Sequence, residues 1–256
     1  MRALHERARS LSSTQRSLQL FLDMLLLHSK LSSAEQKIVL DLPGKPARIR
    51  NRVDIVSPGE VVDHACLVTS GLVARFDQMR NGHRQTTALH IPGEMCDLHS
   101  VVQPKASWSI TAITDASVVF IPHKPLRDAA LRHPHLAFAF WRDSAALSAI
   151  LGKWVGNLGR KNATARVAHL ICEMGLRNEA AGLGTRSNYD LPMTQEQLAD
   201  AVGVTPVHVN RTLQVLRKHA GLTFKRPRVV VEDWKQLAEV AEFDPEFLQL
   251  RTGGLT

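Results

Sequence analysis

The sequence predicts an α+β protein in which a helical N-terminal segment and a β-rich domain precede one long helix and a C-terminal winged helix-turn-helix. Three observations support this prediction. Short β-branched runs alternate with glycine turns between about residues 46 and 122, as a small β-sandwich or roll requires. An uninterrupted helical pattern follows over residues 134–161. Two capped helices joined by a glycine turn, and then a hairpin pattern, occupy the C-terminal part.

Length and composition are typical of a two-domain globular protein. The chain has 256 residues, of which 44% are apolar and 22% charged, and single domains usually hold about 100–150 residues. No run reaches the roughly 20 apolar residues that a membrane span needs. Nothing after the N-terminal arginines resembles a signal-peptide cleavage site. We therefore expect a cytoplasmic protein that has no membrane partner.

These patterns divide the chain into four parts. In the first part, apolar residues recur at helical spacings of three and four, and Ser33 is the expected N-cap of a second short helix. The parts are a helical N-terminal segment, a β domain, a long helix and a C-terminal domain that ends in an acidic helix: residues 1–40, 41–133, 134–161 and 162–256.

Turn signals divide the β domain at intervals of about ten residues. They are Pro58-Gly59, Ser70-Gly71, Asn81-Gly82 and Pro92-Gly93. Asn81-Gly82 predicts a two-residue type I′ hairpin, because both central positions of that turn need positive φ. A strand over residues 117–121 closes the domain.

The long helix carries apolar residues at alternating spacings of three, four and seven, which is typical of a seam between packed helices. At about 1.5 Å per residue this helix would span about 40 Å. Asp143 falls in the seam, and Gly152, Gly156 and Gly159 weaken it. We predict a dimer contact through the larger apolar side chains of the seam: Phe140, Leu147, Leu151, Trp154 and Leu158.

The C-terminal domain contains the helix-turn-helix pattern. Thr194 and Gln197 form a capping box at the start of the first helix, and Gly203 can take the left-handed conformation that ends it. Thr205 caps the second helix, whose first turn accepts Pro206. Two helices joined by so short a turn cross closely, as in DNA-binding proteins.

The second helix has an inward and an outward side. Val209, Thr212, Leu213 and Leu216 are expected to pack inward. Arginine and glutamine on the other side are the residues that read guanine and adenine edges, and a valine there can contact a thymine methyl. The following sequence predicts a hairpin wing with a basic tip at residues 225–228, suited to the phosphate backbone.

Charge supports a polyanionic partner. The formal net charge is +8 with a pI near 9.8; residues 161–231 carry ten basic against five acidic side chains, whereas residues 232–256 carry two against six. We predict double-stranded DNA as the partner. The predicted contact residues are Thr194, Thr205, Val207, His208, Asn210, Arg211, Gln214, Lys218, Lys225, Arg226 and Arg228.

The motif LPMTQEQLADAVGVT at residues 191–205, with VNRTL at residues 209–213, resembles the Crp/Fnr (cyclic-AMP receptor and fumarate-nitrate regulator) family. The order of β domain and long helix resembles that family over roughly residues 30–232. The resemblance implies a β-roll sensor of the cyclic-nucleotide-binding type, a dimerisation helix, and a homodimeric transcription regulator on a two-fold symmetric operator. RNA polymerase is a further candidate partner. Arg211 matches the family's base-reading arginine.

Two departures from the family change the expected specificity. Pro206-Val207 replaces the usual Arg-Glu of the recognition helix, so the operator should differ from that of the best-known members. In the sensor, Ala106 stands where the family binds the cyclic phosphate with arginine, which removes a charge-assisted pair. We expect no cyclic-AMP binding. The effector, a small molecule or a redox signal, stays open, and its candidate region is Glu94, Cys96, Asp97 and Ser107.

We expect no cofactor. Residues 1–40 contain no cysteine, which excludes the family's N-terminal iron–sulfur cluster. Cys66, Cys96 and Cys172 lack metal-binding spacing, so buried free thiols are the first interpretation, with Cys96 as a redox switch the alternative. A metal or haem site among the twelve histidines, which include His90, His99, His133 and His135, is a second alternative, although HxxxH and HExxH spacings are absent.

A different class of function stays open beside DNA binding: an effector-binding module that acts through protein partners. Salt separates the two, because a protein that neutralises about six phosphates loses about 10³-fold or more in affinity between 50 and 200 mM salt. We do not expect an enzyme, since the sequence shows no phosphate loop, nucleophile elbow or metalloprotease motif.

Overall fold

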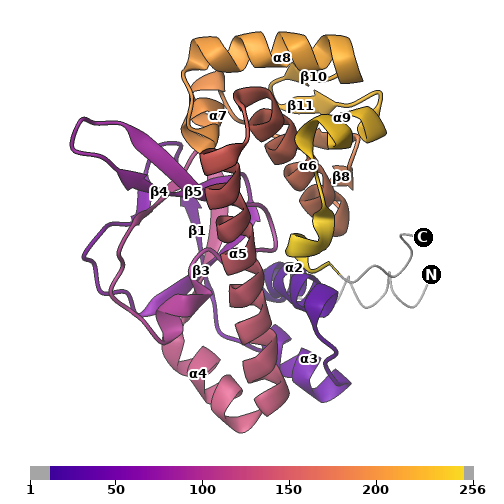
Figure 1. Ribbon diagram of the computed structural model, residues 1–256. Helices are drawn as coiled ribbons and strands as arrows, with labels where there is room; N and C mark the ends of the chain where they lie inside the picture. The colour runs from indigo at the N-terminus through magenta and orange to yellow at the C-terminus, as the bar shows by residue number, and fades with distance from the viewer. Residues whose placement is uncertain (1–11, 251–256) are drawn as a thin grey trace. The chain divides into compact units, whose positions relative to one another are not determined.

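The computed structural model describes residues 12–250. The chain forms two compact units, which are described separately (Figure 1). The first takes the described residues up to Val73 together with His90–Ala145, and the second takes Ala74–Leu89 together with the residues from Ala146 onward.

The first unit begins with two helices, α2 (Ser13–His28) and α3 (Ser33–Leu40). The apolar side chains predicted to form one helical face lie in the core; Leu18 and Phe21 are fully buried. The predicted cap of α3 was wrong by one residue. Ser32 is the N-cap, because its Oγ accepts from the Glu35 backbone while the Glu35 carboxylate accepts from the Ser32 N–H at 2.8 Å.

Three strands form one antiparallel sheet in the order β1 (Lys45–Ile49), β7 (Ala116–Pro122) and β3 (His64–Ser70). The central strand β7 is the predicted closing strand. One core cluster joins α2 to this sheet, and Phe21 of α2 stacks with Phe140 at a centroid distance of 6.2 Å. Burial of such side chains stabilises the unit by roughly 1.5–3 kcal/mol each.

A second sheet has the strand order β2-β6-β4-β5, with bounds Asp54–Val56, Ser109–Ala112, Val73–Gln78 and Arg84–His90. The predicted hairpin joins β4 to β5, but its two-residue type I′ turn was wrong. The Met79 N–H donates to the His83 carbonyl at 2.8 Å, so the turn between them is longer. Within the described residues positive φ falls on Gly82 and not on Asn81, because the Asn81 side chain accepts from the His83 N–H instead.

Two short elements of the first unit were not predicted. They are the 3₁₀ helix η1 (Leu98–Val101) and helix α4 (His123–Arg132). The sequence obscures α4 because the helix contains Pro125 in its first turn and ends at Arg132, two residues before Pro134. Prolines therefore lie at both ends of a helix of ten residues.

The predicted long helix is confirmed as α5 (Pro134–Arg160), with 27 residues. Its first turns belong to the first unit and its last four turns to the second. No helix among residues 12–250 is both long enough and apolar enough to cross a membrane.

The C-terminal part of the second unit contains the predicted three helices and hairpin. The helices are α6 (Ala163–Ala180), α7 (Gln195–Val202) and α8 (Pro206–Ala220), and the hairpin strands are β10 (Thr223–Lys225) and β11 (Arg228–Val230). A second hairpin, β8 (Gly184–Thr185) and β9 (Asn188–Asp190), was not predicted. It extends the sheet to the order β10-β11-β9-β8. Strands of two and three residues leave no periodic pattern in a sequence.

The acidic C-terminal segment is not one continuous helix. It forms α9 (Trp234–Ala241) and the 3₁₀ helix η2 (Pro245–Leu248). Glu242 takes positive φ at the end of α9, and Pro245 starts η2. A left-handed residue followed by a proline cannot continue an α-helix.

Candidate nucleic-acid interface

The first helix of the motif, α7, is fixed by the predicted capping box. The Gln197 N–H donates to Thr194 Oγ1 at 3.1 Å, and the Thr194 N–H donates to Gln197 Oε1 at 2.8 Å. The helix ends at Gly203, whose φ is 65°. A side chain at this φ would be strained, so glycine permits the chain to turn at once toward α8.

Helix α8 starts two residues later. The His208 N–H donates to Thr205 Oγ1 at 3.3 Å, and Pro206 occupies the first turn. Proline has no backbone N–H, and in the first turn of a helix this costs nothing, because no carbonyl of the helix is available there to accept a hydrogen bond. The predicted caps at both helices are therefore confirmed, and both threonine hydroxyls are used by their own helices.

The inward side of α8 packs as predicted, with one exception. Val209 and Leu216 are fully buried and Thr212 nearly so, whereas Leu213 is only half-buried. Helices α6, α7 and α9 each contact α8. The inward side thus fixes α8 to the second unit and leaves the other side free.

The outward side of α8 is exposed. Val207 is 65% exposed, and the remaining predicted residues of this side are also open to solvent: His208, Asn210, Arg211, Gln214 and Lys218. In Figure 1 this helix lies at the edge of the second unit, next to α7 and β10. An exposed helix with donors of several kinds on one side can enter the major groove of DNA.

A side-chain relay links the two helices of the motif. Gln195 Oε1 accepts from Asn210 Nδ2 at 3.3 Å, and Asn210 Oδ1 accepts from Gln214 Nε2 at 2.9 Å. The relay orients two of the predicted base-reading amides before DNA is present. Sequence reasoning missed Gln195, although the four-residue spacing of the two α8 amides signals the second of these bonds.

The predicted basic wing is present. Strands β10 and β11 pair antiparallel, with Lys225 opposite Arg228. Lys225, Arg226 and Pro227 are exposed at its tip. Val229 is fully buried and pairs with Tyr189 of β9, so the base of the wing is fixed to the domain while its charged tip is free.

Arg228 differs from the other wing residues because its guanidinium already has partners. Its Nε lies 3.2 Å from Asp190 Oδ1, and its Nη1 donates to Asn188 Oδ1 at 3.2 Å. Both partners come from β9, which the sequence did not reveal. A phosphate would have to share Arg228 with a carboxylate, whereas Lys225 and Arg226 are free to bind one.

The dimer residues predicted on α5 need correction. Phe140 and Trp154 are buried within the chain: Phe140 stacks on Phe21, and Trp154 Nε1 donates to Glu173 Oε2 at 2.6 Å. These two side chains therefore cannot lie on an exposed seam. The other three predicted residues are half-buried: Leu147, Leu151 and Leu158.

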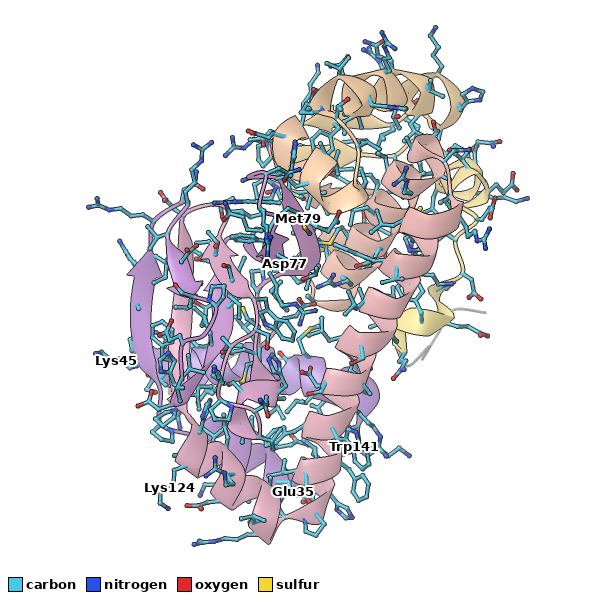
Figure 2. All side chains as sticks on the ribbon, turned by 60° about the vertical axis from the view of Figure 1, so that its left-hand side comes forward. Glu35, Lys45, Asp77, Met79, Lys124 and Trp141 are labelled. Atoms are coloured by element: carbon cyan, nitrogen blue, oxygen red, sulfur yellow. The ribbon has the colours of Figure 1, made fainter. Side chains whose placement is uncertain are left out.

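A different stripe of α5 is exposed, at alternating spacings of three and four. Trp141 is 69% and Val155 62% exposed, and Figure 2 shows the Trp141 side chain on the outer side of the helix. Phe138 stacks on Trp141 at 6.0 Å. We call these residues the α5 stripe: Phe138, Trp141, Ala145, Ser148, Gly152, Val155 and Gly159.

The four predicted effector residues do not share one environment. Cys96 and Asp97 are buried, Glu94 is half-buried and Ser107 is exposed. Asp97 Oδ1 accepts from the Cys66 N–H at 2.7 Å. Burial raises the pKa of Asp97 to about 6, and Glu94 Oε2 accepts from the Ile91 N–H at 3.1 Å. These two carboxylates therefore hold the backbone of the β domain.

The thiols of the chain are buried, as the first interpretation predicted. Burial, and then a hydrogen bond with Cys66, raises the pKa of Cys96 well above its ordinary value. A thiol that stays protonated is a poor nucleophile. The structure therefore favours structural thiols over a redox switch at Cys96.

Three of the histidines considered for a metal site, His90, His99 and His135, have different side-chain neighbours. His90 lies 3.8 Å from Glu94 and His135 lies 3.1 Å from Glu35. His99 packs edge-on against Trp108. Over residues 12–250 no three histidine, cysteine or acidic side chains lie close enough together to hold a metal ion.

Comparison with known proteins agrees with both halves of the chain. Residues 165–240 match the Crp-like helix-turn-helix domain, and residues 48–133 match the cyclic nucleotide-binding domain. Together these two matches cover more than half of the chain.

Individual relatives match along most of their length. The chain is 25% identical to the transcriptional activator protein FnrL of Cereibacter sphaeroides, over 75% of this chain and 78% of the relative. It is 26% identical to the nitrogen fixation regulation protein FixK of Azorhizobium caulinodans, over 78% and 79%. The solved structure of FixK2 from Bradyrhizobium japonicum superimposes with a TM-score of 0.71 at 27% identity, over 78% of this chain and 98% of that structure.

The structure and the comparisons lead to the same conclusion. The structure shows a helix-turn-helix in which both helices are capped and α8 has an exposed outward side. The comparisons match the same segment to a Crp-like helix-turn-helix domain and the chain to transcription regulators. The chain belongs to the Crp/Fnr family and is a DNA-binding transcription regulator.

Proposed function

We propose that the protein is a homodimer that binds a two-fold symmetric operator, with α8 of each subunit in the major groove. The observation that supports this most directly is the exposed outward side of α8, which offers a guanidinium, amides and an apolar side chain. Half-sites one helical turn apart, about 34 Å, would then be read by the two subunits.

Arg211 is the main base-reading residue of this proposal. A guanidinium can donate two hydrogen bonds to guanine O6 and N7, and glutamine or asparagine can bond adenine in the same way. Gln214 and Asn210 already form the relay with Gln195. Val207 is placed for a thymine methyl. Proline and valine at the start of α8, where relatives in the family carry Arg-Glu, give the protein an operator of its own.

Backbone contacts would come from the wing and the helix starts. Lys225 and Arg226 are the free cations of the wing tip, while Arg228 would contribute less because Asp190 already pairs with it. The Thr194 and Thr205 hydroxyls cap their helices, and the positive ends of α7 and α8 attract phosphate there.

The α5 stripe would form the dimer contact. It contains no charged side chain, and its spacing is the seven-residue repeat of paired helices. Its small residues would permit close approach, with Trp141 and Val155 as the larger contacts. The stripe lies on one continuous helix, so a second copy of the same helix is its natural partner.

The dimer contact is tested by measuring molar mass in solution. We expect about twice the chain mass of 28.4 kDa for the wild type, and dissociation in Val155→Asp because two carboxylates would be desolvated in the contact. Leu131→Asp is the matched control, since Leu131 is an apolar residue of α4 that is 76% exposed and lies outside the stripe. A dimeric Val155→Asp variant would contradict this contact.

The β domain would sense a signal other than cyclic AMP. The candidate effector region and its neighbour Ala106 do not suit a cyclic phosphate: Ala106 offers no charge, and the carboxylates of Glu94 and Asp97 accept hydrogen bonds from backbone N–H groups. Calorimetric titration with cyclic AMP should show no heat of binding. RNA polymerase is proposed as a further partner on the strength of the family.

Base reading is tested by binding of DNA selected from a random pool. Arg211→Ala should lose about 1–3 kcal/mol on the selected site and little on random DNA. Arg132→Ala removes the same charge from an exposed position on α4 and should bind like the wild type. An equal loss on both DNAs would exclude a reading role for Arg211. A weak, flat dependence of affinity on salt would instead favour a module that acts through protein partners.

A further inference from the structure

The C-terminal end of α7 leads directly into the turn before α8, so the direction of α8 depends on how this end is held. The last four carbonyls of a helix have no N–H partner inside the helix, and in α7 they belong to residues 199–202. The Ala199 carbonyl accepts from the Gly203 N–H. The Val202 carbonyl accepts from Nη1 of Arg166 in α6 at 2.9 Å. The two carbonyls between them take their donor from a distant part of the chain.

That donor is Gln85 of strand β5. Its Nε2 donates to the Asp200 carbonyl at 3.0 Å and to the Ala201 carbonyl at 3.4 Å. The same nitrogen donates to the Thr86 carbonyl at 3.0 Å, which holds the amide against its own strand. Gln85 and α7 belong to the same compact unit, although 115 positions separate Gln85 from Asp200 in the sequence. A side chain of the β domain therefore completes the hydrogen bonding of the first helix of the motif.

The charges of the β4–β5 hairpin also suit this helix end. Burial raises the pKa of Asp200, and Glu196 raises it further, whereas Arg84 and His83 of the hairpin lower it. The C-terminus of a helix is its negative end, so a carboxylate there is stabilised by cations opposite it. Two neighbouring residues of the hairpin thus favour the same contact that Gln85 makes.

Gln85 lies beside the turn glycine as well. A Cβ on Gly203 would lie 3.6 Å from Gln85 Oε1. Gly203 is the residue at which the chain leaves α7 toward α8, so the Gln85 amide contacts the motif at the point where its geometry is set.

We propose that Gln85 is a positioning residue for DNA binding: by donating to the carbonyls of Asp200 and Ala201, it holds the end of α7 and so fixes the direction of α8. Gln85 is not one of the predicted DNA contacts. It would act through α8, and this role rests on the proposed reading of bases by that helix.

A positioning role predicts a loss of specificity rather than a general loss of affinity. Hydrogen bonds to base edges weaken steeply when they are misaligned, whereas attraction to DNA phosphates depends mainly on charge and carries no sequence information. A side chain that only stabilises the fold would change binding to all DNA sequences equally. The informative quantity is therefore the ratio of affinities for the selected site and for random DNA.

Three substitutions of Gln85 in the full chain test the donor. Gln85→Glu keeps the shape of the side chain, removes both N–H groups and brings negative charge to the negative end of α7. Gln85→Ala removes the side chain. Gln85→Lys restores a donor, and Lys161 shows that a lysine can hold such a helix end, because its Nζ donates to the Ala241 carbonyl at the end of α9 at 2.6 Å.

We expect Gln85→Ala to lower the affinity ratio about three- to tenfold, which is the equivalent of one hydrogen bond. Gln85→Glu should lower it at least as much, although glutamate fills the same space as glutamine. Gln85→Lys should keep the wild-type ratio, since an added charge attracts selected and random DNA alike. Circular dichroism checks that each variant folds; if Gln85→Glu does not fold, the comparison of Gln85→Ala with Gln85→Lys decides.

Gln36→Ala is the matched control. Gln36 of α3 is half-buried like Gln85, and its Nε2 donates to the Leu31 carbonyl at 2.9 Å, so the variant removes the same kind of bond elsewhere in the chain. It should keep the wild-type ratio.

A wild-type ratio in Gln85→Ala and Gln85→Glu, or a ratio in Gln85→Lys as low as in Gln85→Ala, would overturn the positioning role. If Arg211→Ala loses specificity while the variants of Gln85 do not, only the positioning role is refuted and base reading by α8 stands. If none of these variants loses specificity, base reading and the role that rests on it are both refuted.

Discussion

Glu173 is a fully buried charged residue of the second unit that joins α5 to α6 through hydrogen bonds. It is fully buried in α6, where its Oε1 lies 2.9 Å from Nη1 of Arg177 and its Oε2 accepts from Trp154 Nε1 at 2.6 Å. Arg177 is itself only 4% exposed. Glu173→Ala would leave a guanidinium in the interior without its counter-charge, which costs about 3–5 kcal/mol.

The same helix offers a matched control. Glu179 also pairs with an arginine, Arg186, at 2.6 Å, but both side chains are about one-third exposed. Removing one partner of an exposed pair costs about 0–1 kcal/mol. Trp154→Phe keeps the Glu173 carboxylate and its arginine and removes one donor, so an intermediate cost of about 1–3 kcal/mol is expected.

The assay is guanidinium-induced unfolding, followed by the loss of helical circular dichroism, on the wild type and the three variants. We expect the free energy of unfolding to fall in the order Glu179→Ala, Trp154→Phe, Glu173→Ala, with the largest loss last. If Glu173→Ala costs no more than Glu179→Ala, then the buried network of Trp154, Glu173 and Arg177 does not hold α5 and α6 together.

Two further predictions concern the β domain and the turn of the DNA-binding motif. Burial raises the pKa of Asp97 to about 6 from 3.8, so the folded state binds the proton more tightly, and the stability that the protonated group contributes is lost as pH rises from about 4 to 6. Asp97→Asn keeps an acceptor for the Cys66 N–H and should unfold with less pH dependence in that window and be more stable at pH 8; an unchanged pH profile would contradict the burial argument. Gly203→Ala places a side chain at φ 65° and its Cβ 2.8 Å from Leu158 Cδ2, which should cost about 1–2 kcal/mol and weaken DNA binding. Gly182 has a similar φ of 70°, and a Cβ there would meet no atom within 4 Å, so Gly182→Ala should lower stability without affecting DNA binding. If both variants lost the same affinity for DNA, the turn at Gly203 would have no specific role in DNA binding.

Local signals in the sequence determined the DNA-binding motif almost completely. Capping boxes, a left-handed glycine and a proline at a helix start act over three or four residues, so α7, α8 and their turn could be located from the sequence alone. The wing followed from two short apolar runs around a basic tip. The same locality explains the confirmed α5, whose helical pattern is long enough to be unambiguous.

Which side of a helix faces its own chain was decided only by the tertiary structure. Helix α5 carries two apolar stripes at similar spacing, and the sequence favoured the one with the larger side chains. Those side chains pack inside the subunit, where Trp154 finds Glu173, while the stripe with glycine and alanine stays exposed. The spacing of apolar residues in the sequence identifies the apolar faces of a helix. Which segment packs against each face depends on residues far away in the chain.

Contacts between distant segments also decided the fine structure of the interface. Gln195 reaches Asn210 across the turn, and Asp190 pairs with Arg228 across two strands. These pairs depend on register and on the short hairpin β8–β9, and neither has a sequence signal of its own. The sequence by itself therefore determined where the helix-turn-helix lies, and tertiary packing decided which charged side chains and which face of α8 are exposed.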